Sequence, residues 1–429
     1  MAPRTPAHAD RHGSSEAPGP SAPCLVLLAL LFQLIGVPFP PGSGPGWGVL
    51  AAQEKGAENP PVGWEFTGIP AFNYDSDEGF GYGAVLAFYD YGPGGLSPYR
   101  ATIQPTVFFT TEGRRELRFF FDTPHLLPSG WRLDFSLDFE DQVATPYYGL
   151  GNQTTYETEK EEGEDPYYYR FGRERRSARI NLQRPLSGIP IRLLFGGGIS
   201  HFTLDPTPKD QGTTLLSEAL GEGGAVPGGT LVSLRAGVVW DTRDHESQPR
   251  TGVWSAFLVD RTDERLGSAA SFTRWTVADR RYVPLGTRLV LAHRVILQTV
   301  SGDPPFFALQ YVQSSYQGLE GLGGSKSLRG VLRNRFTGKG LFIWNAELRF
   351  RLLDFRFLGK DCHLVTSGFL DSGRVWESGL DLGGLVSGLH HGIGGGLRVG
   401  MGPNFVVGFD QGVSDEGGLQ TYIGLGFLF

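Results

Sequence analysis

The fold of this chain is decided by the stretch Trp131-Arg132-Leu133-Asp134-Phe135-Ser136-Leu137-Asp138-Phe139-Glu140, in which apolar and polar side chains alternate without a break. Successive side chains of a β-strand point to opposite faces, so this period of two predicts a strand with one apolar and one polar face. The alternation continues for about ten residues, whereas strands of soluble proteins most often have roughly 5–6. A tilted strand needs about ten residues to cross a bilayer, so the length favours a membrane-spanning strand.

The same alternation recurs along the chain. Val232 to Trp240 and Phe342 to Phe350 are two further clear examples. Sixteen such runs are expected, near 64–73, 80–91, 99–111, 114–123, 130–141, 167–184, 190–204, 231–242, 252–261, 271–283, 288–300, 340–352, 362–375, 390–400, 403–412 and 419–429.

Short and long connections alternate between these runs. Short ones at 185–188, 284–287 and 402–403 interleave with long ones at 142–166, 205–229 and 301–339. Outer-membrane barrels have this parity, with short periplasmic turns and long outer loops, and an even strand number leaves both chain ends in the periplasm. The predicted fold class is therefore all-β: a single transmembrane β-barrel of sixteen antiparallel strands whose longest, sixth outer loop is 301–339. A large soluble double sandwich is the alternative, but it does not explain the parity.

Composition agrees with a β-protein and excludes some partners. Gly 63 and Pro 29 together disfavour long helices, while 40% hydrophobic residues are too many for a disordered chain. Lys+Arg 38 against Asp+Glu 45 gives a net charge of -7 without a basic block, so nucleic acid is not an expected partner. Only Cys24 and Cys362 are present, which is too few for a disulfide framework.

The amino-terminal region is predicted to be a targeting segment. An almost wholly apolar run from Cys24 to Phe39 has the length of a signal-peptide core, and the small residues Ala51 and Ala52 offer a cleavage site. An uncleaved helical anchor is the weaker reading, because prolines and a glycine interrupt the run. We predict a signal peptide over 1–52, a short periplasmic lead over 53–63, and a barrel domain over 64–429. The barrel is expected in the cell outer membrane, of the Gram-negative type.

Four stretches of the chain resemble the BamA/TamA-type outer-membrane assembly and translocation proteins, also called the bacterial surface antigen family. Each stretch is a weak signal alone, but their order and spacing together are specific. They are Tyr147-Tyr148-Gly149-Leu150-Gly151-Asn152; Trp240-Asp241-Thr242-Arg243-Asp244 followed by Pro249 and Gly252; Ser327-Leu328-Arg329-Gly330-Val331 followed by Asn345-Ala346-Glu347-Leu348-Arg349; and Gly368-Phe369-Leu370-Asp371-Ser372-Gly373-Arg374-Val375-Trp376.

The resemblance implies that the sixth outer loop folds back into the barrel and is locked there. In the family the Arg-Gly pair of this loop docks against the Asp of an Asp-x-Gly strand and the Glu of the strand before it. Carried over, Arg329 meets Asp371, which precedes Gly373, and Glu347. Both carboxylates lie on the polar phase of their strands, and a buried guanidinium needs such partners. Gly330 would let the loop backbone approach the wall closely.

The chain ends Tyr422-Ile423-Gly424-Leu425-Gly426-Phe427-Leu428-Phe429, which resembles the signals that barrel-assembly machinery reads. The alternation predicts that Ile423, Leu425, Phe427 and Phe429 face lipid while Gly424 and Gly426 face inward. Such a last strand would remain able to pair as an edge.

The resemblance implies a protein or lipid assembly or translocation barrel, with outer-membrane lipid and client outer-membrane proteins or lipids as partners. Family members carry periplasmic POTRA repeats, for which 53–63 leaves no room, so we expect a member without them and with a separate periplasmic partner. The alternative function is a passive, porin-like diffusion pore. Gly-x-Ser-x-Gly, His-Glu-x-x-His and phosphate-binding glycine loops are missing from the sequence, so we expect no enzyme activity, cofactor or metal site.

Overall fold

The computed structural model describes residues 62–429, apart from 76–78, 112, 164, 211, 222, 223, 225, 227, 317 and 358. The predicted signal peptide (1–52), and all of the predicted lead (53–63) except residues 62 and 63, lie outside the described residues. The domain division therefore stays a prediction.

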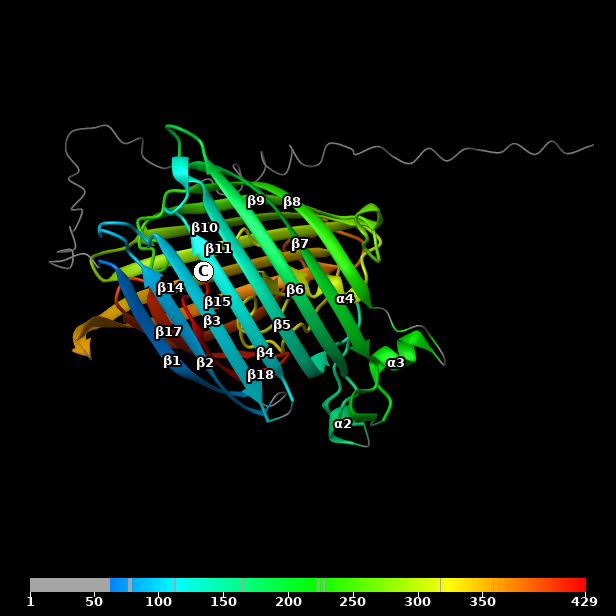
Figure 1. Ribbon diagram of the computed structural model, residues 1–429. Coiled ribbons are helices and arrows are strands. Elements are labelled where there is room, and N and C mark those ends of the chain that lie inside the picture. The colour runs from blue at the N-terminus through cyan, green and yellow to red at the C-terminus, as the bar shows by residue number, and fades with distance from the viewer. Residues whose placement is uncertain are drawn as a thin grey trace, which may run out of the picture. The chain divides into compact units, whose positions relative to one another are not determined.

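Sixteen strands form one antiparallel sheet, and each strand pairs with its neighbours in chain order (Figure 1). Every one of the predicted strand regions overlaps one of them. The strands are β1 (Trp64–Asp75), β2 (Gly79–Asp90), β3 (Ala101–Thr110), β4 (Arg115–Thr123), β5 (Arg132–Pro146), β6 (Arg170–Pro185), β7 (Ile191–Asp205), β8 (Gly229–Asp241), β9 (Gly252–Thr262), β10 (Phe272–Pro284), β11 (Leu289–Gly302), β14 (Gly340–Phe357), β15 (Lys360–Trp376), β16 (His390–Met401), β17 (Phe405–Ser414) and β18 (Gly418–Leu425).

The remaining elements are short and lie in the connections. They are the strand pair β12 (Tyr311–Val312) and β13 (Leu319–Glu320), and the helices η1 (Pro128–Gly130), α2 (Thr158–Glu162), η2 (Pro208–Asp210), α3 (Leu215–Leu220), η3 (Glu264–Leu266) and α4 (Phe306–Leu309). In Figure 1, α2 and α3 lie together at one end of the strands, where the long connections gather. Among the helices of the described residues, none has both the length and the apolar character needed to cross a membrane.

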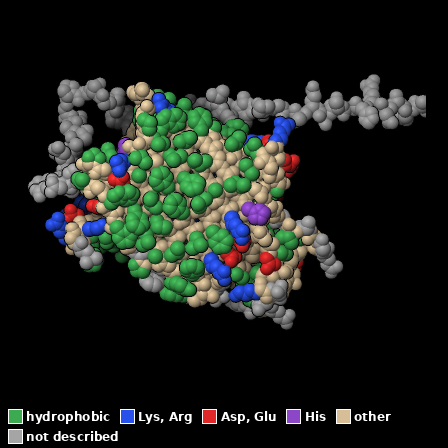
Figure 2. Space-filling model, in the orientation of Figure 1, with side chains coloured by type: hydrophobic (Ala, Val, Ile, Leu, Met, Phe, Trp, Pro, Cys, Tyr) green, Lys and Arg blue, Asp and Glu red, His purple; other side chains and the backbone are tan. Residues whose placement is uncertain are grey.

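The two faces of the sheet differ as the alternation predicts. On the apolar face, Leu137 is 45% and Leu234 57% exposed. On the polar face, Asp134 and Asn345 are fully buried. Figure 2 shows the apolar face as a broad green field with charged side chains at its margins. A soluble protein buries its apolar side chains, so this reversal fits a sheet that is surrounded by lipid.

The sheet curls, so that β2–β7 cross in front of β10–β15 in Figure 1. β1 and β18 are the two ends of the strand order and lie in contact, but no ladder joins them among the described strands. The connection between β11 and β14 packs on the polar face through an apolar cluster with side chains of the sheet. Its buried members include Val312, Leu322, Leu328, Val331 and Phe336 of the connection, and Leu194, Trp254, Leu258, Ile296 and Ile343 of the strands.

Candidate functional site

The Arg329 side chain lies in a fully buried cluster of charges between the β11–β14 connection and the sheet. Its Nε donates to Asp371 Oδ2 over 2.8 Å and its Nη2 to Asp371 Oδ1 over 3.0 Å. Its Nη1 donates to Glu347 Oε1 over 2.7 Å, and its main-chain N–H donates to Asp371 Oδ2 over 3.1 Å. A two-pronged contact of this kind fixes the direction of the guanidinium as well as its position. The structure thus brings together the three charged residues that the sequence singled out.

Two further partners of Arg329 were not found from the sequence. The Phe369 ring lies 3.5 Å from the guanidinium carbon, and Asp410 Oδ2 lies 3.4 Å from Nη1. Phe369 precedes Asp371 by two positions and so shares its face of β15, a signal that could have identified it. Asp410 lies on β17, two strands from β15 in the same sheet, and carries no local motif that would have identified it.

Two glycines make the close approach possible. Gly330 has φ +91°, and a Cβ there would lie 2.7 Å from the backbone carbon of Val413. Its N–H donates to Tyr422 Oη over 3.0 Å. At Gly373 a Cβ would lie 2.6 Å from Leu322 Cδ1, so this position on β15 also leaves room for the connection. A larger residue at either position would push the connection off the sheet.

The carboxyl-terminal tail corrects the predicted orientation of Phe427 and Phe429. β18 ends at Leu425, and Gly426 at φ +77° takes the chain out of the strand. Phe429 is only 7% exposed, and the guanidinium carbon of Arg349 lies 4.3 Å from the centre of the Phe427 ring. These two rings therefore lie on the polar face and not toward lipid, because the period of two applies only while the chain stays extended.

The tail joins the same charge cluster. Arg349 Nη2 donates to the main-chain oxygen of Phe429 over 2.9 Å and forms an ion pair with Glu347 at 2.7 Å. Arg294 Nη1 contacts the main-chain oxygen of Leu428 at 3.4 Å. Within the strand, Ile423 remains 48% exposed as predicted, and Gly424 lies near Lys326 on the polar face. The role of Gly424, Phe427 and Phe429 as an assembly signal stays a prediction.

The second predicted motif forms a ten-residue turn between β8 and β9, which we call the strap (residues 242–251). Arg243 Nη2 pairs with Asp241 Oδ2 at 2.9 Å. Asp244 Oδ1 accepts hydrogen bonds from several backbone N–H groups of the strap, including that of Arg250 at 2.9 Å. Pro249 is buried, and a Cβ at Gly252 would lie 2.3 Å from the Thr242 main-chain oxygen. These residues explain the shape of the turn.

The strap also reaches other turns at the same end of the strands. Ser247 Oγ donates to Asn404 Oδ1 over 3.2 Å, and Gln248 Nε2 donates to the Pro403 main-chain oxygen over 3.2 Å. Asn404 in turn donates to Tyr91 Oη over 3.0 Å. One turn therefore links β8–β9 to the β16–β17 and β2–β3 connections.

Glu246 anchors the strap to the polar face. Its carboxylate accepts hydrogen bonds from Arg132 Nη1 and Nη2 over 2.8 and 3.0 Å, and it lies 4.0 Å from Arg192. Burial acts to raise the pKa of this carboxyl, but Arg132, followed by Arg243 and Arg192, lowers it to about 2. Sequence inspection did not single out Glu246, because its ion-pair partners Arg132 and Arg192 come from other strands.

The first predicted stretch, Tyr147 to Asn152, lies at the opposite end. The Gly151 N–H donates to the Thr337 main-chain oxygen over 2.8 Å. Asn152 Nδ2 donates to the Gly388 main-chain oxygen over 2.8 Å, while its Oδ1 accepts from the Val375 N–H at 2.9 Å. The β5–β6 connection is thereby tied to both the β11–β14 and the β15–β16 connections.

Ion pairs and hydrogen bonds thus join the connections to the polar face of the sheet and to one another. In the described part of the chain, no three or more His, Cys, Asp or Glu side chains are arranged to hold a metal ion.

Comparison with known proteins identifies a matching family and similar solved structures. The model of the Omp85 superfamily domain matches residues 102–415. BamA from Haemophilus ducreyi lacking POTRA domains 1–3 is similar in structure, with a TM-score of 0.53 at 14% identity over 85% of this chain and 69% of that chain. CdiB from Escherichia coli has a TM-score of 0.53 at 15% identity over 85% of this chain and 62% of that chain. No curated protein sequence matches. Since the family model covers well over half of the sequence, the chain belongs to the Omp85 superfamily.

Proposed function

We propose that this chain is a closed outer-membrane β-barrel that assembles or translocates client proteins or lipids. Membership of the Omp85 superfamily supports this proposal, as does the exposed apolar face of the sheet. In the proposed arrangement the β11–β14 connection is the sixth outer loop, folded into the barrel, and β1 meets β18 at a seam.

The observation that carries the proposal is the Arg329 cluster beside an unpaired sheet edge. Arg329 holds the long connection against Asp371 and Glu347. The same connection meets the last two strands, because Gly330 contacts Ser414 and Tyr422. A loop that is held by one lock and also touches the last strands can couple its own position to the opening of the seam. We therefore assign Arg329, Gly330, Glu347, Asp371 and Gly373 to a loop lock.

The partners proposed are those that such a barrel requires. The lipid of the outer membrane contacts the apolar face, and a client outer-membrane protein or lipid engages the seam. A separate periplasmic protein would deliver the client to the end of the barrel that the strap crosses.

The test is assisted folding in vesicles. Purified protein is reconstituted in phospholipid vesicles, a urea-unfolded eight-stranded outer-membrane protein is added, and the folded fraction is followed by its shifted gel band. A disulfide between cysteines introduced in β1 and β18, in a Cys362→Ala background, closes the seam covalently. We expect faster folding of the added protein, loss of this effect when the pair is oxidised, and recovery with a reductant.

The same vesicles separate this function from a passive pore. A steady conductance across a planar bilayer that oxidation of the seam does not change, together with no acceleration of folding, would establish the porin-like alternative and exclude the assembly proposal.

A further inference from the structure

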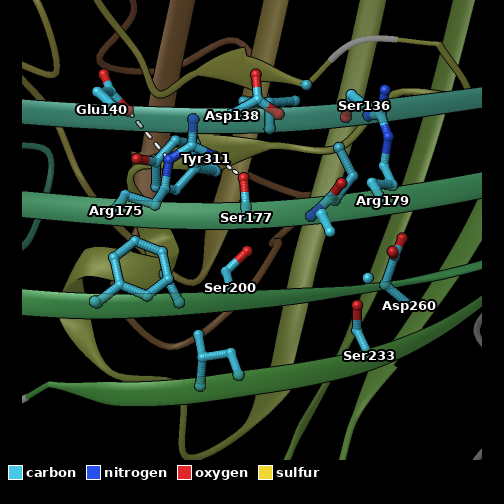
Figure 3. Close-up of a pocket in the computed structure, with 18 of the residues that line it drawn as sticks. Ser136, Asp138, Glu140, Arg175, Ser177, Arg179, Ser200, Ser233, Asp260 and Tyr311 are labelled. Carbon is cyan, nitrogen blue, oxygen red and sulfur yellow. Dashed lines mark hydrogen bonds and ion pairs between the residues drawn. The ribbon is translucent and has the colours of Figure 1, made fainter. Parts of the chain in front are cut away.

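A polar cavity of 220 Å³ lies between the polar face of β4–β10 and residues 308, 311–313 and 318–320 of the long connection (Figure 3). Its floor is made of small hydroxyl side chains on four successive strands. Figure 3 shows these as Ser136 on β5, Ser177 on β6, Ser200 on β7 and Ser233 on β8. A volume of this size far exceeds the ~10–15 Å³ that one water molecule requires. The cavity therefore has room for a polar group larger than water.

The carboxylates that line the cavity are already paired. Each lies within ion-pair distance of its own guanidinium: Glu116 with Arg114 at 2.8 Å, Asp138 with Arg118 at 2.6 Å, Glu140 with Arg175 at 3.1 Å, Asp260 with Arg235 at 2.7 Å, and Glu320 with Arg333 at 3.6 Å. This pairing leaves two lining guanidiniums, those of Arg179 and Arg274, without a carboxylate of their own.

Arg274 is the clearer of the two. It is only 4% exposed, and its Nη2 donates to the Ala308 main-chain oxygen over 2.5 Å. Its Nε is buried without a hydrogen-bond partner, and among the described residues no carboxylate lies within 4.0 Å. Asp260, directly opposite Arg274 on β9, attracts it but already pairs with Arg235 at 2.7 Å. One carboxylate therefore serves two buried guanidiniums, and an anion at this place would balance the remaining positive charge.

Arg179 repeats this situation on β6. Its Nη2 donates to the Tyr316 main-chain oxygen, and its Nε is buried without a partner. The nearest carboxylate, Asp134, is 3.9 Å away and accepts a hydrogen bond from Asn181. Arg235, on β8 between the two strands, is close enough to repel both Arg179 and Arg274. Arg179, Arg235 and Arg274 thus surround one side of the cavity, and the carboxylates nearest to them, Asp134 and Asp260, are fewer than the guanidiniums.

We propose that this cavity binds an anion with the chemistry of a phosphate group, held by Arg179, Arg235 and Arg274. Planar guanidiniums bind phosphate oxygens through parallel hydrogen bonds, and the serine hydroxyls of the floor supply further donors. The ligand is either a free phosphate or the phosphate of a lipid headgroup. Binding is a property of the folded chain and does not depend on assembly or translocation.

The test measures binding of inorganic phosphate to the purified full chain in a neutral detergent by ³¹P line broadening. We expect saturable binding. Losing charge-assisted hydrogen bonds to an anion weakens binding about tenfold or more. The double variant Arg179→Gln/Arg274→Gln should therefore bind phosphate at least that much more weakly than the parent. Arg280→Gln is the matched control: Arg280 lies on the same face of β10 as Arg274 and stacks 4.2 Å from the centre of the Trp254 ring, outside the cavity lining. It should bind phosphate as the parent does.

Short-chain lipids distinguish the two sources. Dihexanoyl phosphatidic acid competing with phosphate, while dihexanoyl phosphatidylcholine does not, identifies a lipid headgroup as the ligand. Competition by neither lipid identifies a free anion. No saturable binding of phosphate or of phosphatidic acid by the parent, or equal binding by the double variant, would overturn the proposal. The gel shift of the folded band shows that each variant is folded.

Discussion

The charged residues of the polar face form a continuous series of contacts. Asp371 contacts Arg329, Arg329 contacts Glu347, and Glu347 contacts Arg349, which holds the tail at Phe429. In a buried series of this kind, removing one member leaves its neighbours without a counter-charge. The effect of a substitution should therefore exceed the value of a single hydrogen bond.

The first prediction concerns Arg329→Ala. Asp371 loses its cation and Glu347 keeps only Arg349, so we expect the folded sheet to be destabilised by about 3–5 kcal/mol and the long connection to be released. The folded gel band should disappear at a lower temperature, and protease cutting should increase between residues 303 and 339. Asp371→Ala should act similarly, and the double variant should be destabilised by clearly less than the sum of the two single effects. Full additivity, or an unchanged protease pattern, would show that Arg329 does not hold the loop.

The second prediction concerns pH and Glu246. Its pKa is lowered to about 2 in the folded chain, from 4.5. A lowered pKa contributes stability that is fully present above the unfolded value and is lost as the pH falls through the folded value. The stability difference between the parent and Glu246→Gln should therefore be constant above about pH 5 and shrink toward pH 2. Thermal unfolding at a series of pH values measures it, and a difference that grows as the pH falls would contradict the assignment.

The strands show where the alternation of apolar and polar residues predicts the structure correctly and where it does not. The hairpin of β14 and β15 is longer than expected, since β14 ends at Phe357 and not near 352. The pairing register shifts between Arg351 and Leu353, and such a bulge interrupts the period of two. Gly426 ends the alternation in the same way before Phe427. The period of two in the sequence locates the strands well, but it does not predict which face a side chain takes beyond a bulge or a left-handed glycine.

The third prediction tests which face of β5 meets lipid. Leu137→Arg places a charge on the apolar face and should cost about 2–4 kcal/mol if it lies near the middle of the bilayer. Val386→Arg is the control, because Val386 is 80% exposed in the β15–β16 connection and should tolerate arginine. Urea unfolding in phospholipid vesicles measures both. Equal costs at the two positions would mean that the apolar face of β5 is not in the hydrocarbon.

At the scale of the whole molecule, the site consists of residues from several strands and from the long connection that packs on them. The Arg329 contacts with Asp371 and Glu347 were expected from the resemblance to a family, since each residue lies in a recognisable stretch. The cavity proposed to bind phosphate was not expected, because Arg179 and Arg274 lie on β6 and β10 and neither is part of a recognisable sequence motif. The strap contacts were missed for the same reason: Ser247 and Asn404 are far apart in the sequence.

The fourth prediction concerns conductance and follows from the strap. The interlocked connections at one end and the strap at the other act on a permeating ion as two resistances in series. If the two resistances are of similar size, releasing only one leaves the other in place, so Arg329→Ala and Glu246→Ala should each change the planar-bilayer conductance far less than the double variant does. The double variant should raise it several-fold more than the two single effects combined. Should either single variant alone reach the conductance of the double variant, only one end would control permeation. If two resistances operate and the proposed function holds, a client can be admitted at one end before the other end opens, so the membrane stays sealed while a client is inside.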